Sequence, residues 1–101
     1  MYAYCLDMPG SDEATQRRVD EELGDEPVPG LVVHVSGPMP GGWRIVDVWE
    51  TDEQQTEFET TRLMPAVMRA TEGQPPPSRP FETYEVEGVD ALTRLGAGVR
   101  V

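Results

Sequence analysis

Large side chains alternate with small or polar ones from Tyr2 to Met8, just before a Pro-Gly pair. This period of two is typical of a strand. Ser11 is predicted to cap a following helix. Asp12 and Glu13 would lie in the first turn of that helix, where the positive end of the helix dipole favours carboxylates. The helix is predicted to end at Gly24, and its apolar stripe is thin.

Two stretches in the middle of the chain predict a hairpin. Residues 30–36 and 43–50 are rich in β-branched and aromatic residues, which favour strands. The run Met39–Gly42 contains a proline and two glycines and predicts the turn between them. If Met39 pairs with Gly42, His34 lies opposite Asp47, whereas a shift of one residue puts the two on opposite faces.

A second helix is predicted from Thr51 to about Ala70. Thr51 and Gln54 have the spacing of a capping box, in which the Gln54 side chain reaches back to the start of the helix. Pro65 lacks an amide hydrogen and crowds the carbonyl of Thr61, so we expect a kink or a break there.

The remaining residues add one more strand. Residues 73–80 contain four prolines and predict a stiff extended connector, 81–87 a last strand, and 91–95 a short helical turn. The predicted order is therefore β-α-β-β-α-β in one domain over residues 1–101. This is an α+β fold of the ferredoxin-like type with a four-stranded antiparallel sheet.

Charge and cysteine content narrow the possible partners. The formal net charge of -11 argues against a nucleic-acid partner, because phosphates would be repelled. Cys5 is the only cysteine, so no intrachain disulfide forms. No apolar run approaches the roughly 20 residues of a membrane span, and no signal segment follows Met1. We therefore expect a cytoplasmic protein that binds neither nucleic acid nor membranes.

The second predicted strand of the hairpin is apolar on both faces. One face carries Trp43, Ile45 and Trp49, and the other carries Val46 and Val48. Two helices cover only one face of a sheet in a chain of this length, so the other face needs a separate cover. A second copy of the chain is the simplest cover, which predicts a homodimer.

Three segments, 30–38, 42–50 and the run Arg-Leu-Met-Pro-Ala at 62–66, resemble small proteins of the dimeric α+β barrel superfamily. That superfamily includes antibiotic biosynthesis monooxygenase-like enzymes, polyketide cyclases and small lactone isomerases. The resemblance implies a ferredoxin-like subunit, sheets that face each other in a dimer, and a ligand cavity between each sheet and its helices. It does not select an activity, because one scaffold carries unrelated chemistries.

His34 and Asp47 are the candidate catalytic pair. His34 is the only histidine, and histidine is readily tuned to transfer protons near neutral pH. Asp47 opposite it would orient such a base. Alternatively, His34 is a half-buried strand residue satisfied by a backbone or carboxylate partner. Asp47 itself needs a partner at a strand centre, and His34 and Arg44 are the two candidates.

Several side chains are candidates for a substrate pocket that holds a flat aromatic or polyketide-like molecule, although core packing alone explains such residues more often. Arg62 is predicted to pair with Glu59 or Asp52, or else to clamp a carboxylate or enolate. The full set of substrate-binding candidates is Trp43, Trp49, Phe58, Arg62, Met64, Met68 and Tyr84.

No motif indicates a metal, a phosphate-binding loop, a serine nucleophile or a flavin, so we expect no cofactor. The resemblance also argues against haem, because haem-binding relatives take their histidine from a helix region. Two hypotheses follow. The first is a cofactor-independent enzyme of secondary metabolism, a monooxygenase or cyclase/isomerase, that transfers a proton on a small hydrophobic substrate. The second is a non-catalytic dimer that binds a small ligand or a protein through its Pro-rich segment and acidic surface.

Overall fold

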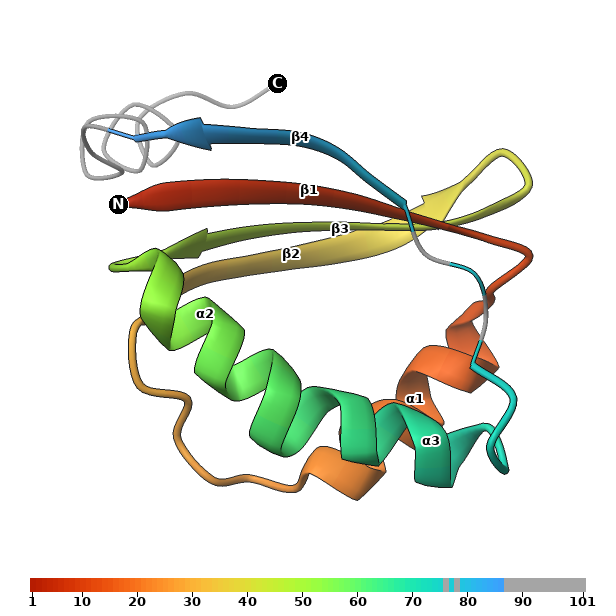
Figure 1. Ribbon diagram of the computed structural model, residues 1–101. Coiled ribbons are helices and arrows are strands. Elements are labelled where there is room, and N and C mark those ends of the chain that lie inside the picture. Colours follow the sequence, from red (N-terminus) through yellow and green to blue (C-terminus); the bar gives the residue numbers. More distant parts are fainter. Residues whose placement is uncertain (76, 78, 87–101) are drawn as a thin grey trace, which may run out of the picture.

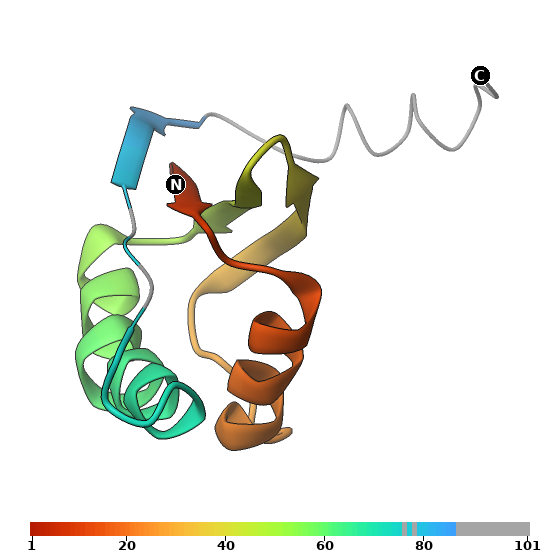
Figure 2. The same cartoon turned by 90° about the vertical axis from the view of Figure 1, so that its right-hand side faces the viewer.

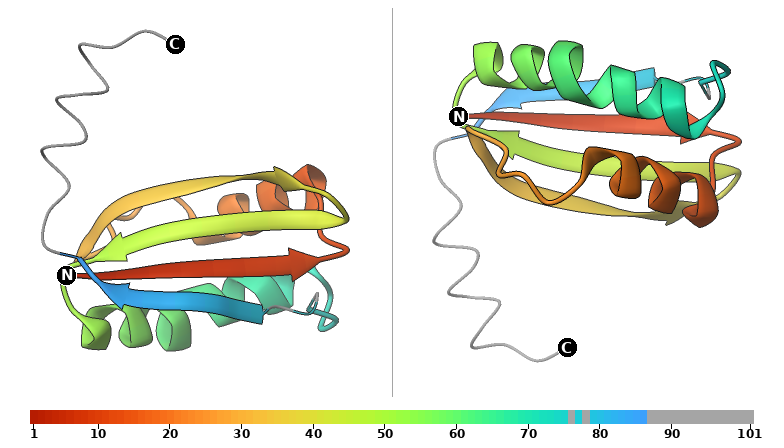
Figure 3. Two further views of the ribbon diagram at one scale, coloured as in Figure 1. Left: turned by 90° about the horizontal axis from the view of Figure 1, so that it is seen from above. Right: turned by 90° about the horizontal axis from the view of Figure 1, so that it is seen from below.

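An antiparallel sheet forms one layer of the protein in the computed structural model, which describes residues 1–75, 77 and 79–86. Strand β3 (Gly42–Trp49) lies between β1 (Tyr2–Pro9) and β2 (Leu31–Met39). Strand β4 (Arg79–Glu85) pairs with the other edge of β1, so the strand order is β2-β3-β1-β4 (Figure 3, left).

Two helical segments lie on one face of the sheet (Figure 1). The first is α1 (Glu13–Leu23), and the second runs without a break through α2 (Asp52–Phe58), η1 (Glu59–Leu63) and α3 (Met64–Ala70). The two segments run side by side in Figure 2, with α1 towards β2 and α2 towards β4 in Figure 3, right. The predicted α+β class and antiparallel sheet are therefore confirmed.

The start of α1 differs from the prediction by one residue. Asp12, not Ser11, is the N-cap, and its carboxylate accepts a hydrogen bond of 2.8 Å from the Thr15 amide. A carboxylate also interacts favourably with the positive end of the helix, which a hydroxyl does not. The helix ends at Gly24 as predicted, where a φ of 74° favours glycine.

The predicted capping box starts α2, and the predicted disturbance at Pro65 takes the form of a π turn. The Gln54 amide donates to Thr51 Oγ1 at 3.1 Å, and Thr51 Oγ1 donates to Gln54 Oε1 at 3.0 Å. In η1 the Met64 amide donates to the Glu59 carbonyl, five residues back. Because the wider turn precedes Pro65, the helix continues and the expected break does not occur.

The turn between β2 and β3 fixes their register. Pro40 and Gly41 are its two central residues, and Gly41 has a φ of 79°, as the third residue of a type II turn requires. Met39 pairs with Gly42, so His34 lies opposite Asp47, as the sequence predicted for this turn. Side chains of residues directly opposite each other project from the same face.

The two faces of the sheet are both apolar but differ in their cover. On the helical side, Trp49 is 1% exposed and its ring centroid is 5.5 Å from that of Phe58. On the other face, Val46 and Val48 are half-buried and Val35 is 57% exposed. The described residues therefore cover one apolar face and leave the second open.

The last strand begins and ends two residues earlier than predicted, at Arg79–Glu85 instead of 81–87. It starts within the proline-rich segment, where Pro80 lies opposite Leu6 beside a bulge. The helical turn predicted at 91–95 lies outside the described residues. In the part of the chain that is described, no helix is long and apolar enough to cross a membrane.

A glycine pair tests the β1–β3 packing. A Cβ at Gly42 would collide with the Met8 carbonyl oxygen, whereas a Cβ at Gly37 would meet nothing within 4 Å. We expect Gly42→Ala to lower the free energy of unfolding by about 1–3 kcal/mol, because backbone atoms cannot yield. Gly37→Ala, the control, should leave it unchanged or raise it slightly. Urea unfolding at one protein concentration measures both, and equal effects would contradict this packing.

Candidate functional site

His34 and Asp47 form a hydrogen-bonded pair across β2 and β3. His34 Nδ1 lies 2.6 Å from Asp47 Oδ1. The His34 side chain is 48% exposed and the Asp47 side chain 21%. Of the two predicted partners for Asp47, the structure therefore selects His34, while Arg44 binds Asp7 through bonds of 2.7 and 3.0 Å.

The pair favours the protonated form of the imidazole. The hydrogen bond to Asp47 raises the pKa of His34 above its ordinary 6.5, partial burial lowers it, and the charges of Asp47 and Asp20 raise it further. The other ring nitrogen, Nε2, has no hydrogen bond to the described residues. An imidazole oriented by a carboxylate with one free nitrogen is the arrangement of a general acid or base.

Tyr4 and Asp52 form a second polar pair on the same face of the sheet, which the sequence analysis missed. Tyr4 lies opposite Asp47 on β1, and its hydroxyl donates a hydrogen bond to Asp52 at the start of α2. Burial, followed by the bond and charge of Asp52, raises the pKa of Tyr4 to about 12. The strand alternation placed Tyr4 on this face, but only the folded chain brings α2 to it.

Both predicted pocket tryptophans are core residues. Trp43 is 8% exposed and Trp49 is 1% exposed, and neither indole nitrogen has a hydrogen-bond partner among the described residues. Trp49 packs on Phe58 with an angle of 41° between the rings. The structure thus favours the packing role that the sequence left open for them.

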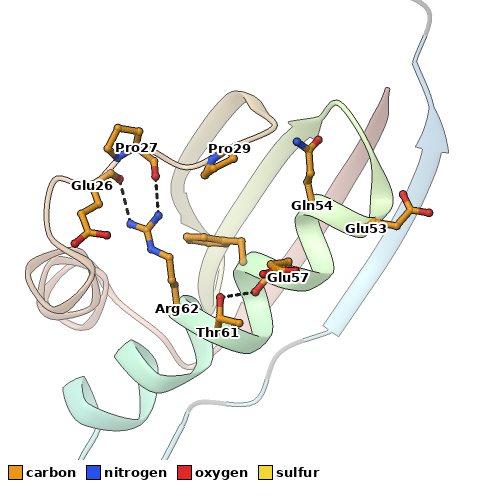
Figure 4. A pocket seen from close by; sticks show the side chains of 9 residues that line it. Glu26, Pro27, Pro29, Glu53, Gln54, Glu57, Thr61 and Arg62 are labelled. Carbon is orange, nitrogen blue, oxygen red and sulfur yellow. Dashed lines mark hydrogen bonds between the residues drawn. The ribbon is translucent and has the colours of Figure 1, made fainter.

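An open groove lies beside Phe58, between α2–η1 and the segment 24–30 that joins α1 to β2 (Figure 4). Its volume is about 510 Å³. Of the predicted substrate-binding residues, it is lined by Phe58 and Arg62, while His34 and Asp47 are not among its walls. The full lining is Glu26, Pro27, Pro29, Glu53, Gln54, Glu57, Phe58, Thr61 and Arg62.

Arg62 binds backbone carbonyls instead of the predicted carboxylates. Its guanidinium donates to Pro27 O at 2.7 Å and to Glu26 O at 3.1 Å (Figure 4). The guanidinium carbon also lies 5.4 Å from the centroid of the Phe58 ring. Arg62 is therefore a tether between the helix and the segment before β2, and its predicted pairing with Glu59 or Asp52 is wrong.

Two of the predicted substrate-binding residues, Met64 and Met68, lie outside the groove. Met64 and Met68 are each 41% exposed and are absent from the lining of the groove. They lie one helical turn apart, after the π turn has changed the direction in which residues beyond Leu63 project. Tyr84 is in β4 opposite Ala3, and its side chain is outside the described part of the structure.

Neither a metal-binding cluster nor a known relative indicates the function of this chain in the described residues. No group of three or more His, Cys, Asp or Glu residues that could hold a metal ion occurs within the described ranges. The chain matches no family model and no curated protein. The geometry of the polar pairs and of the groove is therefore the evidence for a function.

The His34–Asp47 pair predicts a specific pH dependence. Because the folded pKa of His34 is raised, the pair should stabilise the fold fully below about pH 6.5 and lose this contribution as pH rises through the folded pKa. Asp47→Asn should return the His34 pKa towards 6.5 and flatten this decline.

NMR titration of the His34 ring measures the pKa without ambiguity, because the chain has one histidine. Urea unfolding between pH 6 and 9 measures the stability. Glu13→Gln, a charge-neutralising change on α1, is the control. It should change neither the titration curve of His34 nor the way in which the free energy of unfolding varies with pH. A parent pKa at or below 6.5 would contradict the pair.

Proposed function

We propose that this chain is a cofactor-independent enzyme that transfers a proton on a small hydrophobic, aromatic or polyketide-like molecule. The observation that carries the proposal is the 2.6 Å contact between His34 Nδ1 and Asp47 Oδ1, which leaves Nε2 available. Asp47 holds the imidazole in one orientation and stabilises the imidazolium that forms when Nε2 accepts a proton.

In this mechanism, neutral His34 removes a proton from an acidic C–H or O–H group of the substrate. Asp47 compensates the positive charge that develops on the ring, and the protonated ring then returns the proton at another atom. Oxygenation, cyclisation and isomerisation of an activated aromatic ketone all begin with this removal. His34 and Asp47 therefore support this first step, the removal of a proton from the substrate, which all three reactions share.

Deuterium exchange into anthrone tests the common step, because this tricyclic aromatic ketone has an acidic methylene group. Under argon in D2O, we expect the parent to accelerate loss of the methylene proton signal. His34→Gln should lower that acceleration by about 10²-fold or more, since general-base catalysis has this magnitude. The rate should rise with pH through the raised pKa of His34, because the neutral ring is the base.

Two further samples complete that experiment. Glu13→Gln is the control variant and should keep the parent rate. Admission of air tests whether the carbanion reacts with oxygen to give the quinone. An exchange rate equal to the buffer rate, or a His34→Gln variant as fast as the parent, would refute proton transfer by His34.

We further propose that the subunit is ferredoxin-like and pairs with a second copy as a dimeric α+β barrel. The strand order β2-β3-β1-β4, with both helical segments on one face, supports the fold. The open face supports the dimer, because Val33, Val35, Val46 and Val48 would all gain burial against another such sheet.

Light scattering tests the dimer. We expect a mass of twice 11.2 kDa at micromolar concentration. Val35→Glu should shift the mass towards one subunit, because it places a charge on the exposed apolar face. Val32→Glu is the matched control, since Val32 is 41% exposed and lies at the bulge of β2. A monomeric parent, or equal effects of the two variants, would contradict a dimer through this face.

A non-catalytic dimer that binds a small ligand is the second candidate function. The observation that favours it is the separation of features: the groove is lined by Phe58 and Arg62 but not by His34 or Asp47. Under this alternative, His34→Gln leaves ligand binding unchanged and the chain does not accelerate proton exchange. The same anthrone experiment therefore distinguishes the two functions.

A further inference from the structure

Direct contacts join the two walls of the groove beside Phe58. Arg62 ties the middle of segment 24–30 to η1 through the carbonyls of Glu26 and Pro27. At the end of that segment, Gly30 has a φ of 87° and packs so closely on Gln54 that a Cβ has no room. These two contacts join the wall formed by segment 24–30 to the wall formed by α2 and η1.

Carboxylates dominate the charge of the groove. Glu26, Glu53 and Glu57 are exposed lining residues, and none of their carboxylates has a hydrogen bond or ion pair within the described residues. Arg62 is the single cation among the nine lining residues, and its donors are directed at neutral carbonyls. The groove therefore repels anions and attracts cations.

The aromatic wall gives an independent indication of what the groove accepts. The Arg62 guanidinium already lies 5.4 Å from the Phe58 ring centroid, which is a cation–π distance. Pro27 and Pro29 add flat apolar surface on the opposite wall (Figure 4). About 510 Å³ of space remains with Arg62 in place, within the range of small-molecule sites.

We propose that this groove binds a small organic cation in which a flat apolar body carries an amidinium, guanidinium or ammonium group. The apolar body lies between Phe58 and the two prolines, and the charged group meets the carboxylates of the rim. The site is separate from the His34–Asp47 pair and does not depend on the proposed proton transfer.

Three ligands of nearly the same shape test the proposal: benzamidine, which is cationic, benzamide, which is neutral, and benzoate, which is anionic. Amide chemical shifts in ¹⁵N-labelled protein are followed during titration with each. We expect benzamidine to give saturable shifts at Glu26, Gln54, Phe58, Thr61 and Arg62. Benzamide should bind at least about fivefold more weakly, and benzoate should give no saturable shift there.

Variants separate the groove from the general acidity of the chain. Glu57→Gln is expected to weaken benzamidine binding by up to about fivefold, which is the range of a partly exposed charge pair. Glu21→Gln, an equal charge change on α1 outside this groove, should leave the affinity unchanged. His34→Gln should also have no effect, so failure of the proposed enzyme function would not alter this result.

Three outcomes would overturn the cation site. Equal binding of benzamidine and benzamide would show an apolar groove without charge selection. Equal weakening by Glu57→Gln and Glu21→Gln would show binding through net charge alone. Benzamidine shifts that do not saturate, or that spread over all acidic surfaces, would show that the groove is not a site. The ligand series does not require any variant to fold.

Discussion

The register of the β2–β3 hairpin is the constraint on which the rest of the structure depends. A two-residue Pro-Gly turn sets Met39 opposite Gly42, and the pairs from there back to Val33 and Val48 follow from it. Because side chains alternate along a strand, a slip of one residue would expose Trp43 and Trp49 and bury Arg44. The same register brings His34 to Asp47, so the turn controls both the core and the candidate catalytic pair.

The second helical segment is attached to the rest of the chain by polar contacts as well as by the core. Tyr4 on β1 binds Asp52 at the start of α2, and Arg62 binds the segment that leads into β2. Between these contacts, Phe58 packs on Trp49. The second helical segment is thus fixed at two positions. The groove lies beside it, between this segment and residues 24–30.

The candidate catalytic pair and the groove lie at different places in this subunit. The His34–Asp47 pair provides a titratable group with a raised pKa, whereas the groove provides volume, an aromatic ring and carboxylates that have no partner within the described ranges. A substrate for proton transfer must approach Nε2 of His34, while a cation in the groove meets Phe58 and the rim. The two sites therefore suit different ligand chemistries.

The sequence by itself determined the local features: the alternation of β1, the capping box at Thr51, the end of α1 at Gly24, and the β2–β3 hairpin, whereas the register that pairs His34 with Asp47 came from the folded structure. These depend on residues near each other in the chain or on a turn of two residues. Tertiary structure decided the rest. Arg62 reaches carbonyls 35 and 36 residues away, Met64 and Met68 project elsewhere after the π turn, and the tryptophans are enclosed. Long-range packing selects among partners that local patterns leave equally available.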